Sequence, residues 1–392
     1  MPNTTAPETP LAETQAAGVQ PPSAPAPGIM EHFAKIKDPR VIGRTEHKLF
    51  DILFIVIAAV IANCDDLEMI VLWAKERETW LRKYCELPNG IPTRFTISRL
   101  LRRLNPDELH IAFAAWMKDL LVILAGDIVA IDGKTMRRAY DRAPGGQGII
   151  HMVSAWVTRN RVVLGQVKVG DKSNEIVAIP ELLRLLEVKG ALVTIDAIGC
   201  QKSIAADLLG RGADYLLAVK ENQRTLAEDI WRTFDEAEAE QLGYAVTLDE
   251  GHGRVELREY YQCVDLSKVS RAKEWVGLRS LGKVVSRRCV VGERSTVETR
   301  YYISSLGCGA ERMAHGIRSH WGIENGLHYV LDVSFSEDRL RVRKDHSPEN
   351  LGIVRHVASN YVNQAAHLGY GIKKRRQLAA LSTEVLQSIL RI

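Results

Sequence analysis

The stretch Ile128-Val129-Ala130-Ile131-Asp132, which runs directly into Gly133-Lys134, decides the fold of this chain. An unbroken apolar run of this length is typical of a buried strand in a central sheet. The stretch Leu192-Val193-Thr194-Ile195-Asp196 is similar and leads into Ile198-Gly199. Each run closes on an aspartate beside turn-forming sequence. If the two strands are neighbours, the carboxylates of Asp132 and Asp196 lie close together.

The sequence around these two runs predicts an α/β domain. Further strands are predicted at Ile149–Val157, Val162–Val169 and Tyr215–Lys220, and helices at Ile176–Val188 and Lys202–Leu209. Three strands followed by helix, strand, helix and strand is the element order of an RNase H-like α/β domain, which is an analogy of fold only. We therefore expect an α/β core with an RNase H-like fold.

A β-rich insertion is expected to interrupt this core at about residues 240–306. The insertion follows a helix predicted at Thr225–Glu236 and includes the β-type stretches Arg254–Val264 and Arg287–Ile303. A long helix at Ala310–Leu331 is then predicted to return to the core. The whole domain is expected to occupy residues 125–392.

The N-terminal part of the chain predicts a tail and an all-helical domain. Residues 1–29 hold half of the 14 prolines and no Lys or Arg, which predicts a disordered Pro/Ala-rich tail. Residues 30–124 contain predicted helices at Leu49–Asn63, Leu67–Tyr84, Thr96–Leu104 and from Pro106 to about Leu124.

One of these N-terminal helices is basic on one face. In Thr96–Leu104, an apolar face opposes a face that carries Arg99, Arg102 and Arg103. This pattern resembles the basic helix of a helix-turn-helix and makes the three arginines candidate DNA contacts. A dimerisation or packing domain is the alternative interpretation of the helical region.

Composition excludes some classes of protein. The formal net charge of +4 and the pI of about 8.6 are too mild to indicate a nucleic-acid partner on their own. No pair of the six cysteines is spaced as C-x-x-C, so we expect reduced thiols of a cytoplasmic protein. The most apolar stretch, Ile52–Ala62, is too short to span a bilayer, and no signal peptide is evident, so we expect no membrane partner.

The paired aspartates favour a divalent cation. Adjacent carboxylates repel each other, and a bound cation removes that conflict. Oxygen ligands favour Mg²⁺ or Mn²⁺, and such ions can activate water for phosphodiester hydrolysis. Aspartates at strand ends are also common as cap or turn residues, so the pattern alone leaves both interpretations open.

A third acid is expected on the helix after the insertion. His320, Glu324 and His328 recur every four residues and therefore share one helix face. Such a face can bind a metal or can be an ordinary solvent-facing or hydrogen-bonded stripe.

Five motifs resemble one family of transposases. They are AIDGKTMRRAY (130–140), VTIDAIGCQ (193–201), YLLAVKENQ (215–223), DEGHGRVELR (249–258) and HWGIENGLHYVLDVSFSEDRLRVRKDHSPENL (320–351). In order and spacing they resemble the ISAs-type DDE transposases of bacterial insertion sequences, a group that includes H-repeat-associated proteins. The resemblance spans roughly residues 30–375.

The resemblance implies a function and its site. It identifies Asp132, Asp196 and Glu324 as the catalytic and metal-binding carboxylates, with Mg²⁺ (or Mn²⁺) as cofactor. It implies that the partner is DNA, at the element's terminal inverted repeats and at the target, and that a homodimer acts on that DNA. Related transposases carry Tyr-x₂-Arg-x₃-Glu-x₆-Lys around the glutamate. Here these positions are Ile317, His320, Glu324 and Leu331.

Other basic residues are predicted to contact DNA. Arg318, His320 or His328 are candidates to substitute for the missing Arg and Lys of that signature. Phosphate contacts are also predicted for residues after the first aspartate and after the glutamate helix, namely Lys134, Arg137, Arg138, Arg339, Arg341, Arg343 and Lys344. A solvated turn and an exposed edge are the respective alternatives.

Three other functions are compatible with the pattern. The chain could be a stand-alone RNase H-like nuclease without strand transfer, or a catalytically inactive or domesticated DNA-binding remnant of a transposase. A zinc protein that uses His320 and His328 is the third, and it predicts stoichiometric zinc in the purified protein.

Overall fold

Strand β1 (Ile128–Met136) pairs with a strand on each side within one nine-stranded sheet. The sheet has the order β3-β2-β1-β4-β5-β9-β8-β7-β6. Strand β1 is parallel to β4 and β4 is parallel to β5, whereas every other neighbouring pair is antiparallel. The predicted α/β class is therefore confirmed. The computed structural model describes residues 28–41, 43–136, 149–170, 173–251, 253–290, 292, 294–339 and 342–392.

The strands form a five-stranded part and a four-stranded extension that share hydrogen bonds between β5 and β9. The other strands of the first part are β2 (Ile150–Val157), β3 (Val162–Lys168), β4 (Leu192–Ile195) and β5 (Asp214–Val219). The extension consists of β6 (Gly243–Gly251), β7 (Arg254–Cys263), β8 (Ser280–Val290) and β9 (Thr296–Ser304). The extension lies within the region 240–306 where β-type sequence was predicted.

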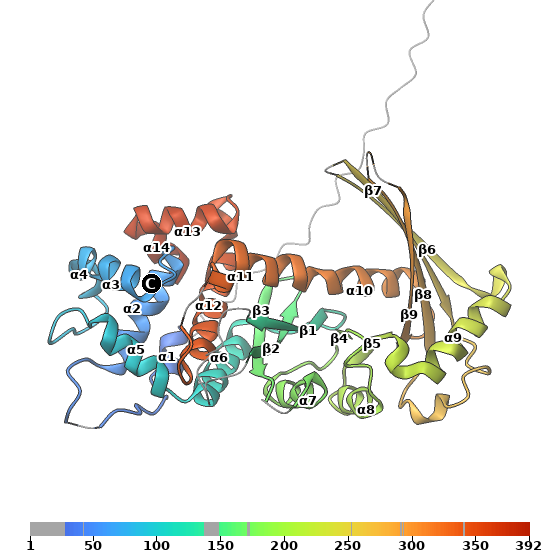
Figure 1. The fold of residues 1–392 in the computed structure, drawn as a ribbon, viewed down its shortest axis with the longest axis horizontal. Coiled ribbons are helices and arrows are strands. Elements are labelled where there is room, and N and C mark those ends of the chain that lie inside the picture. Colours follow the sequence, from blue (N-terminus) through green and yellow to red (C-terminus); the bar gives the residue numbers. More distant parts are fainter. Residues whose placement is uncertain are drawn as a thin grey trace, which may run out of the picture.

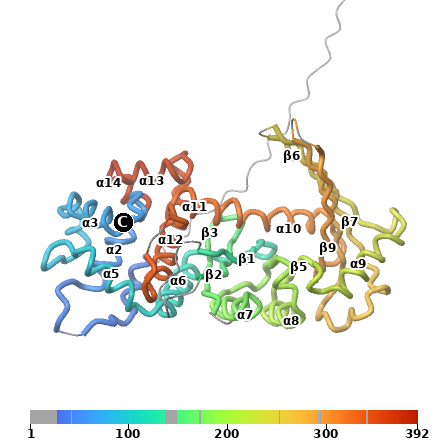
Figure 2. The backbone as a smooth tube through the Cα atoms, in the orientation of Figure 1, coloured from blue at the N-terminus to red at the C-terminus, as the bar shows by residue number. Residues whose placement is uncertain are grey.

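Helices cover both faces of the five-stranded part (Figure 1). On one face lie α7 (Glu175–Leu185) and α8 (Lys202–Gly210), and α9 (Arg224–Glu236) lies beside the extension. On the other face α10 (Ala310–Ile323) runs across the sheet and continues through a π-helical segment, Glu324–His328, into α11 (Tyr329–Ser334). Figure 2 shows that this continuous helix connects the β6–β9 end of the molecule to the helices at the opposite end.

The remaining helices form one helical body. Its N-terminal members are α1 (Ile29–Phe33), α2 (Leu49–Ile61), α3 (Leu67–Glu76), α4 (Glu78–Leu81), α5 (Arg94–Arg103) and α6 (Pro106–Leu120). Its C-terminal members are α12 (Ser347–Gln364), α13 (Ile372–Leu381) and α14 (Thr383–Leu390). Helix α12 packs directly on α2, α5 and α6, so the two ends of the chain share one core. The domain boundary predicted near residue 124 stays a prediction, but packing does not separate the helices there.

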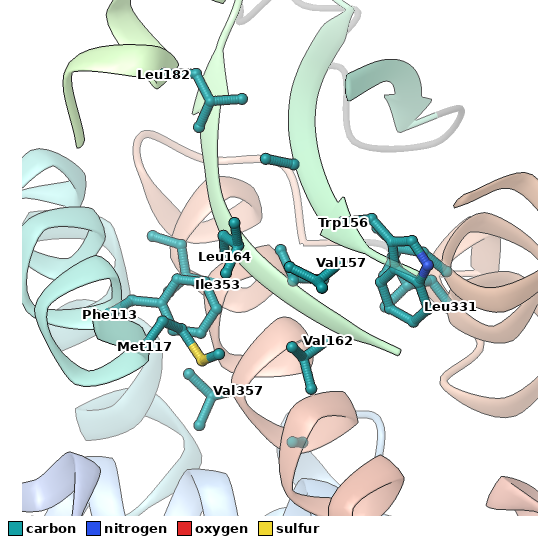
Figure 3. Close-up of a cluster of buried hydrophobic side chains, with 14 of the residues drawn as sticks. Phe113, Met117, Trp156, Val157, Val162, Leu164, Leu182, Leu331, Ile353 and Val357 are labelled. Atoms are coloured by element: carbon teal, nitrogen blue, oxygen red, sulfur yellow. The ribbon is translucent and has the colours of Figure 1, made fainter. Parts of the chain in front are cut away.

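Buried apolar side chains join the helical body to the sheet (Figure 3). Phe113 and Met117 of α6 meet Leu164 of β3 and Val357 of α12 in this core. Asn360 of α12 also hydrogen-bonds the backbone of Val163, accepting from its N–H (2.9 Å) and donating to its C=O (2.8 Å). Because the edge strand β3 is covered in this way, its unpaired backbone groups are not left open for another chain.

Two local predictions differ from the structure, and a third lies almost entirely outside the described residues. Strand β1 was predicted to end at Asp132 but continues to Met136, because its pairing with β2 runs on to Met136↔Ile150. The helix predicted at Leu67–Tyr84 is divided at Arg77 into α3 and α4. The tail predicted at 1–29 lies almost entirely outside the described residues. Among the described residues, no helix is long and apolar enough to cross a membrane.

Gly326 fixes how closely the π-helical segment approaches the sheet. A Cβ atom at this position would lie 2.8 Å from Cζ2 of Trp156, whose side chain is fully buried and cannot move aside. Gly326→Ala is expected to lower the free energy of unfolding by about 1–3 kcal/mol because the core has no space for the added methyl group. Urea denaturation measures the change.

Gly322 on the same helix provides the matched control. A Cβ at Gly322 meets its nearest neighbour at 3.5 Å, an ordinary contact. Gly322→Ala should therefore leave stability unchanged or raise it by up to about 1 kcal/mol. Equal destabilisation by both variants would contradict this account of the packing.

Candidate active site

Parallel pairing of β1 with β4 brings the two predicted aspartates to one edge of the sheet. The register pairs Ile131 with Ile195, so Asp132 and Asp196 are the next residues on the two strands. Strand β4 ends at Ile195, and the Asp196 carboxylate accepts hydrogen bonds from the backbone N–H groups of Ile198 (3.1 Å) and Gly199 (3.4 Å). The backbone of the turn that follows β4 therefore orients the Asp196 carboxylate. Asp132 occupies the matching position on the neighbouring strand β1.

Glu324 approaches Asp132 from the helix that crosses the face of the sheet opposite to α7 and α8 (Figure 1). It is the first residue of the π-helical segment, and its side chain is about half exposed (52%). His328 lies between the two acids: its Nδ1 is 3.7 Å from Oδ2 of Asp132 and 3.6 Å from Oε2 of Glu324. Ligand atoms of Asp132, Glu324 and His328 all lie within 4.8 Å of one another.

The carboxylates in this group have shifted pKa values. Burial, reinforced by the negative charge of Glu324, raises the pKa of Asp132 to about 7 against the opposing influence of His328. Burial and the charge of Glu175 raise the pKa of Asp196. The His328 imidazole lowers the pKa of Glu324. Buried carboxylates that resist ionisation are common at functional sites, because a bound cation can offset the cost of their charge.

A cleft of about 910 Å³ opens over these residues between the core and the extension. Its lining includes Asp132, Asp196, Glu324, His320, Trp321 and Arg300. The Arg300 guanidinium lies 4.9 Å from the centre of the Trp321 ring. Thus the cleft is lined by acids, a cation and an aromatic ring.

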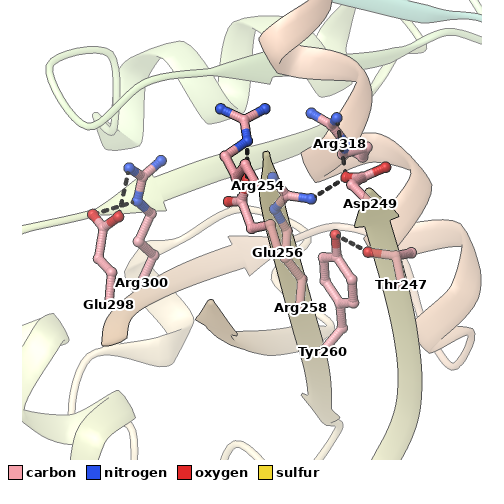
Figure 4. A network of polar contacts seen from close by, with 9 residues as sticks. All are labelled: Thr247, Asp249, Arg254, Glu256, Arg258, Tyr260, Glu298, Arg300 and Arg318. Carbon is pink, nitrogen blue, oxygen red and sulfur yellow. Dashed lines mark hydrogen bonds and ion pairs between the residues drawn. The ribbon is translucent and has the colours of Figure 1, made fainter. Parts of the chain in front are cut away.

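Ion pairs hold the extension against α10 (Figure 4). Arg318 of α10 lies 3.1 Å from the Asp249 carboxylate of β6, which also pairs with Arg258 of β7. Arg258 in turn contacts Glu256, and Arg300 pairs with Glu298. Arg318, a predicted DNA contact, is thus engaged within the protein, although about 41% of its side chain remains exposed.

A second polar group beside Asp132 was not predicted. Glu175, the first residue of α7, contacts Nε2 of His151 on β2, and Nδ1 of His151 lies 2.9 Å from the Thr135 hydroxyl. A Cβ at Gly133 would lie only 2.2 Å from Glu175 Oε1, so the absence of a side chain there makes room for this pair. Sequence reasoning missed it because only the fold brings residues 133, 151 and 175 together.

Lys134, predicted to bind phosphate, is buried in an ion-pair cluster. Its Nζ lies 2.5 Å from both Asp332 and Glu337. These carboxylates raise the pKa of Lys134 although burial opposes the rise. Arg137, Arg138 and Arg341 lie outside the described residues. His320 donates to or accepts from the Thr194 hydroxyl at 3.0 Å, and burial lowers its pKa to about 4, so it carries no charge at neutral pH.

The two other predicted basic groups lie side by side. Arg102 of α5 pairs with Asp345 at 2.6 Å, beside Lys344. A groove of about 920 Å³ is lined by Arg94 and Phe95 of α5 and by Ser336 and Arg339 after α11. Arg99, Arg103, Arg339 and Lys344 are exposed, and Arg343 is partly buried. Thus the structure brings together α5 and the stretch after the glutamate helix, which are far apart in sequence.

The residues present fit a divalent cation. Two carboxylates and an imidazole nitrogen converge, and the carboxylate of Asp196, which is not part of this ligand group, directly follows the adjacent strand β4. Oxygen-rich sets of this kind suit Mg²⁺ or Mn²⁺. His320, in contrast, is hydrogen-bonded to Thr194, and it is not one of the grouped ligands.

Comparison with known families identifies the class of protein. The sequence model of the family described as "Transposase DDE domain" matches residues 124–361. The chain belongs to the DDE transposase family. A model described as DDE_Tnp_1-associated matches residues 30–117 of the same transposase. The predicted family resemblance is therefore confirmed.

Relatives match this transposase along most of its length. The protein named "H repeat-associated putative transposase YhhI", from Escherichia coli (strain K12), is 38% identical over 369 residues, covering 92% of this chain and 97% of the relative. "Putative transposase YncI" from Escherichia coli O157:H7 is 40% identical over 367 residues, covering 92% of this chain and 94% of the relative. A solved structure titled as a piggyBac transposase synaptic complex with hairpin DNA has a TM-score of 0.44 at 12% identity, covering 92% of this chain and 76% of that one.

Removal of the Lys134 charge should destabilise the transposase. Glu337 is almost completely buried (4% exposed), and Lys134→Met would remove the cation that hydrogen-bonds its carboxylate, leaving the charge of Arg355 as the other cation that acts on it. We expect a loss of roughly 3–5 kcal/mol in the free energy of unfolding. Lys344→Met is the control, because Lys344 is exposed and its replacement should change stability by less than about 0.5 kcal/mol. If urea denaturation gives similar values for the two variants, Lys134 has no such structural role.

The metal-free protein should lose stability as Asp132 ionises. Its pKa in the folded state is about 7, above the ordinary value, so the folded state binds this proton more tightly than the unfolded state. The resulting stability is present at low pH and is lost as the pH rises toward 7, by up to about 1.4 kcal/mol per pH unit. Asp132→Asn cannot ionise, so in EDTA its stability relative to the unaltered protein should rise between pH 5 and pH 7.

Asp249→Asn is the control for this titration. Interaction with Arg258 and Arg318 lowers the pKa of Asp249, although burial opposes the shift, so Asp249 is ionised throughout this pH range. Its variant should differ from the unaltered protein by a constant amount. A constant difference for Asp132→Asn as well would show that Asp132 does not titrate as described.

Proposed function

We propose that this chain is the transposase of a bacterial insertion sequence that binds the element's terminal inverted repeats and catalyses metal-dependent DNA cleavage and strand transfer. The observation that carries the proposal is the convergence of Asp132 and Glu324 within one ligand group, with Asp196 in the adjacent register position. Three segments that are distant in sequence supply these acids. If the aspartates served only as cap or turn residues, their carboxylates would not need to lie near Glu324.

The proposal includes an RNase H-like core. We assign this core to β1–β5 with α7, α8 and α10, interrupted by an insertion at about 240–306 and preceded by a helical domain at 30–124. The strand order β3-β2-β1-β4-β5 supports the assignment, because it places the first two acids on neighbouring central strands. The extension β6–β9 then bounds the cleft on the side opposite the helical body.

Asp132 would hold both ions of a pair, and Asp196 and Glu324 would each hold one. Mg²⁺ or Mn²⁺ bound there supplies an activated water and stabilises the leaving 3′ oxygen. The protein's own part is positioning and charge placement. The turn after β4 fixes Asp196 through two backbone hydrogen bonds, and the π-helical segment presents Glu324 toward Asp132. No covalent intermediate on a side chain is required.

DNA would approach along two basic surfaces. One comprises Arg99, Arg102 and Arg103 of α5 together with Arg339, Arg343 and Lys344. Arg339 lines the groove beside α5, and Arg102 pairs with Asp345, the residue after Lys344. The other includes Arg300, which lines the cleft, and the partly exposed Arg318 of α10. Arg137, Arg138 and Arg341 remain predicted contacts. We propose that a homodimer holds the two element ends, as joining requires both.

The test uses DNA that carries the inverted repeats bordering the gene. In Mg²⁺ the unaltered protein should cleave this end and join it to target DNA. Asp132→Asn, Asp196→Asn and Glu324→Gln should each reduce cleavage by at least about a hundredfold, because each removes charge stabilisation at the reacting phosphate. Gel-shift affinity for the same DNA should be largely retained.

Glu298→Gln is the matched control, since Glu298 lines the same cleft but pairs with Arg300. Its cleavage rate should stay near that of the unaltered protein. Cleavage that survives Asp132→Asn would overturn the assignment of the site. DNA binding without cleavage by the unaltered protein would instead identify an inactive remnant, and cleavage without joining would identify a stand-alone nuclease.

A further inference from the structure

A small pocket borders His328, whose Nδ1 faces the acids. Its volume is about 10 Å³, measured as the space open to the centre of a water molecule, which is about enough for one water. It is lined by Lys134, Met136, Met152, Ser154, Gln166, His328, Leu331, Glu337, Gly352 and His356. The pocket is therefore bordered both by His328 of the ligand group and by the Lys134–Glu337 ion pair.

Three buried polar atoms belong to residues that line this pocket. They are Nε2 of His328, Nε2 of Gln166 and Nδ1 of His356, and none has a hydrogen-bond partner among the described residues. All three side chains are more than nine-tenths buried. An unsatisfied buried polar atom costs about 1–3 kcal/mol of folding free energy. Three such atoms around one pocket would therefore destabilise the folded state considerably.

The donors and acceptors of the pocket suit one water molecule. The Gln166 amide nitrogen is a donor. His356 is neutral, because burial lowers its pKa to about 3, so one of its ring nitrogens accepts. If Nε2 of His328 carries its hydrogen, a water can accept from Gln166 and His328 and donate to Nδ1 of His356. Such a water makes the three hydrogen bonds that are typical of buried water.

The positions of the ring hydrogens determine what the other nitrogen of His328 presents. In a neutral ring with its hydrogen on Nε2, Nδ1 carries a lone pair that faces Asp132 and Glu324 at 3.7 and 3.6 Å, whereas a protonated ring donates from Nδ1 to these carboxylates. A lone pair that faces two carboxylates is unfavourable unless a cation lies between them. Histidines that bind metals usually donate the hydrogen of the second ring nitrogen to such an outer partner.

We propose that His328 is a nitrogen ligand of the catalytic metal site, oriented by an ordered water that Gln166 and His356 hold behind it. The inference rests on the proposed function, since it requires the metal bound by Asp132 and Glu324. Gln166 and His356 are positioning residues, because they act on the metal only through His328. An imidazole ligand also favours Mn²⁺ over Mg²⁺, which takes oxygen ligands.

The experiment is pulsed EPR of Mn²⁺ bound to the full-length protein. A histidine ligand produces a ¹⁴N modulation of the Mn²⁺ signal, and labelling the protein with ¹⁵N-histidine should shift it to ¹⁵N frequencies. The modulation should disappear in His328→Gln and persist in His320→Gln, which alters the other histidine beside Glu324. The labelling experiment needs no substitution, so it stands even if His328→Gln does not fold.

The role of the pocket is tested by Mn²⁺ affinity. Gln166→Leu should weaken Mn²⁺ binding about tenfold to a hundredfold in calorimetry, as the loss of outer partners does at other metal sites. Gln387→Leu removes a comparable amide bond, to Tyr84 far from the site, and should leave the affinity unchanged.

The possible results distinguish three claims: the His328 ligand, the role of the pocket and the metal site itself. Mn²⁺ that binds with no histidine modulation, or a modulation that survives in folded His328→Gln, overturns the assignment of His328 and leaves the acid triad intact. Unchanged affinity in Gln166→Leu overturns the role of the pocket. An unaltered protein that binds no Mn²⁺, or an Asp132→Asn variant that binds it equally well, refutes the proposed metal site itself.

Discussion

The close packing of the α10–π–α11 helix on β1 and β2 is the constraint on which the candidate site depends. Gly326 allows the helix to rest on the buried Trp156 ring, and Gly316 allows a similar approach to Leu192 and Leu216. At this distance Glu324 and His328 reach Asp132. A helix held further from the sheet would leave three separate polar side chains in place of one group.

The same helix also links the two ends of the molecule. Arg318 ties it to the extension through Asp249, and Asp332 ties its last turn to Lys134 in the core. The acid group lies between these two anchors. Burial of the Lys134–Glu337 pair costs desolvation energy, so the pair need not stabilise the fold relative to apolar residues. It does fix the position of the turn after α11 next to the site.

Much of the fold could be predicted from local sequence, because burial dictates the apolar runs. The runs that end in Asp132 and Asp196 predict central strands, and the apolar stripe of Ile176–Val188 predicts a helix that the structure has at Glu175–Leu185. The full length of β1 could not be predicted, because the residues after Asp132 stay extended only through pairing with β2. Propensity at Gly133 favours a turn, and tertiary pairing overrides it.

The site was predictable only in part for a similar reason. Motif resemblance singled out Asp132, Asp196 and Glu324, and spacing placed His328 on the face of Glu324. The buried state of Lys134 was not predictable, because Glu337 follows it by about two hundred residues and no local pattern joins them. The meeting of Glu175 with His151 over Gly133 likewise depends on strand order and not on spacing.

The helical body has a consequence for how the chain matures. Helix α2 is almost wholly apolar and buried, and its main covering comes from α12, which the ribosome completes near the end of synthesis. Arg376 of α13 also holds the end of α2 in place, because it donates to the carbonyl of Val60 and pairs with the carboxylate of Asp65. Contacts at such separation form slowly. Until α12 is made, the face of α2 that α12 covers is exposed, although α1 and α3 already pack on α2, so a nascent or truncated product is a substrate for chaperones and proteases.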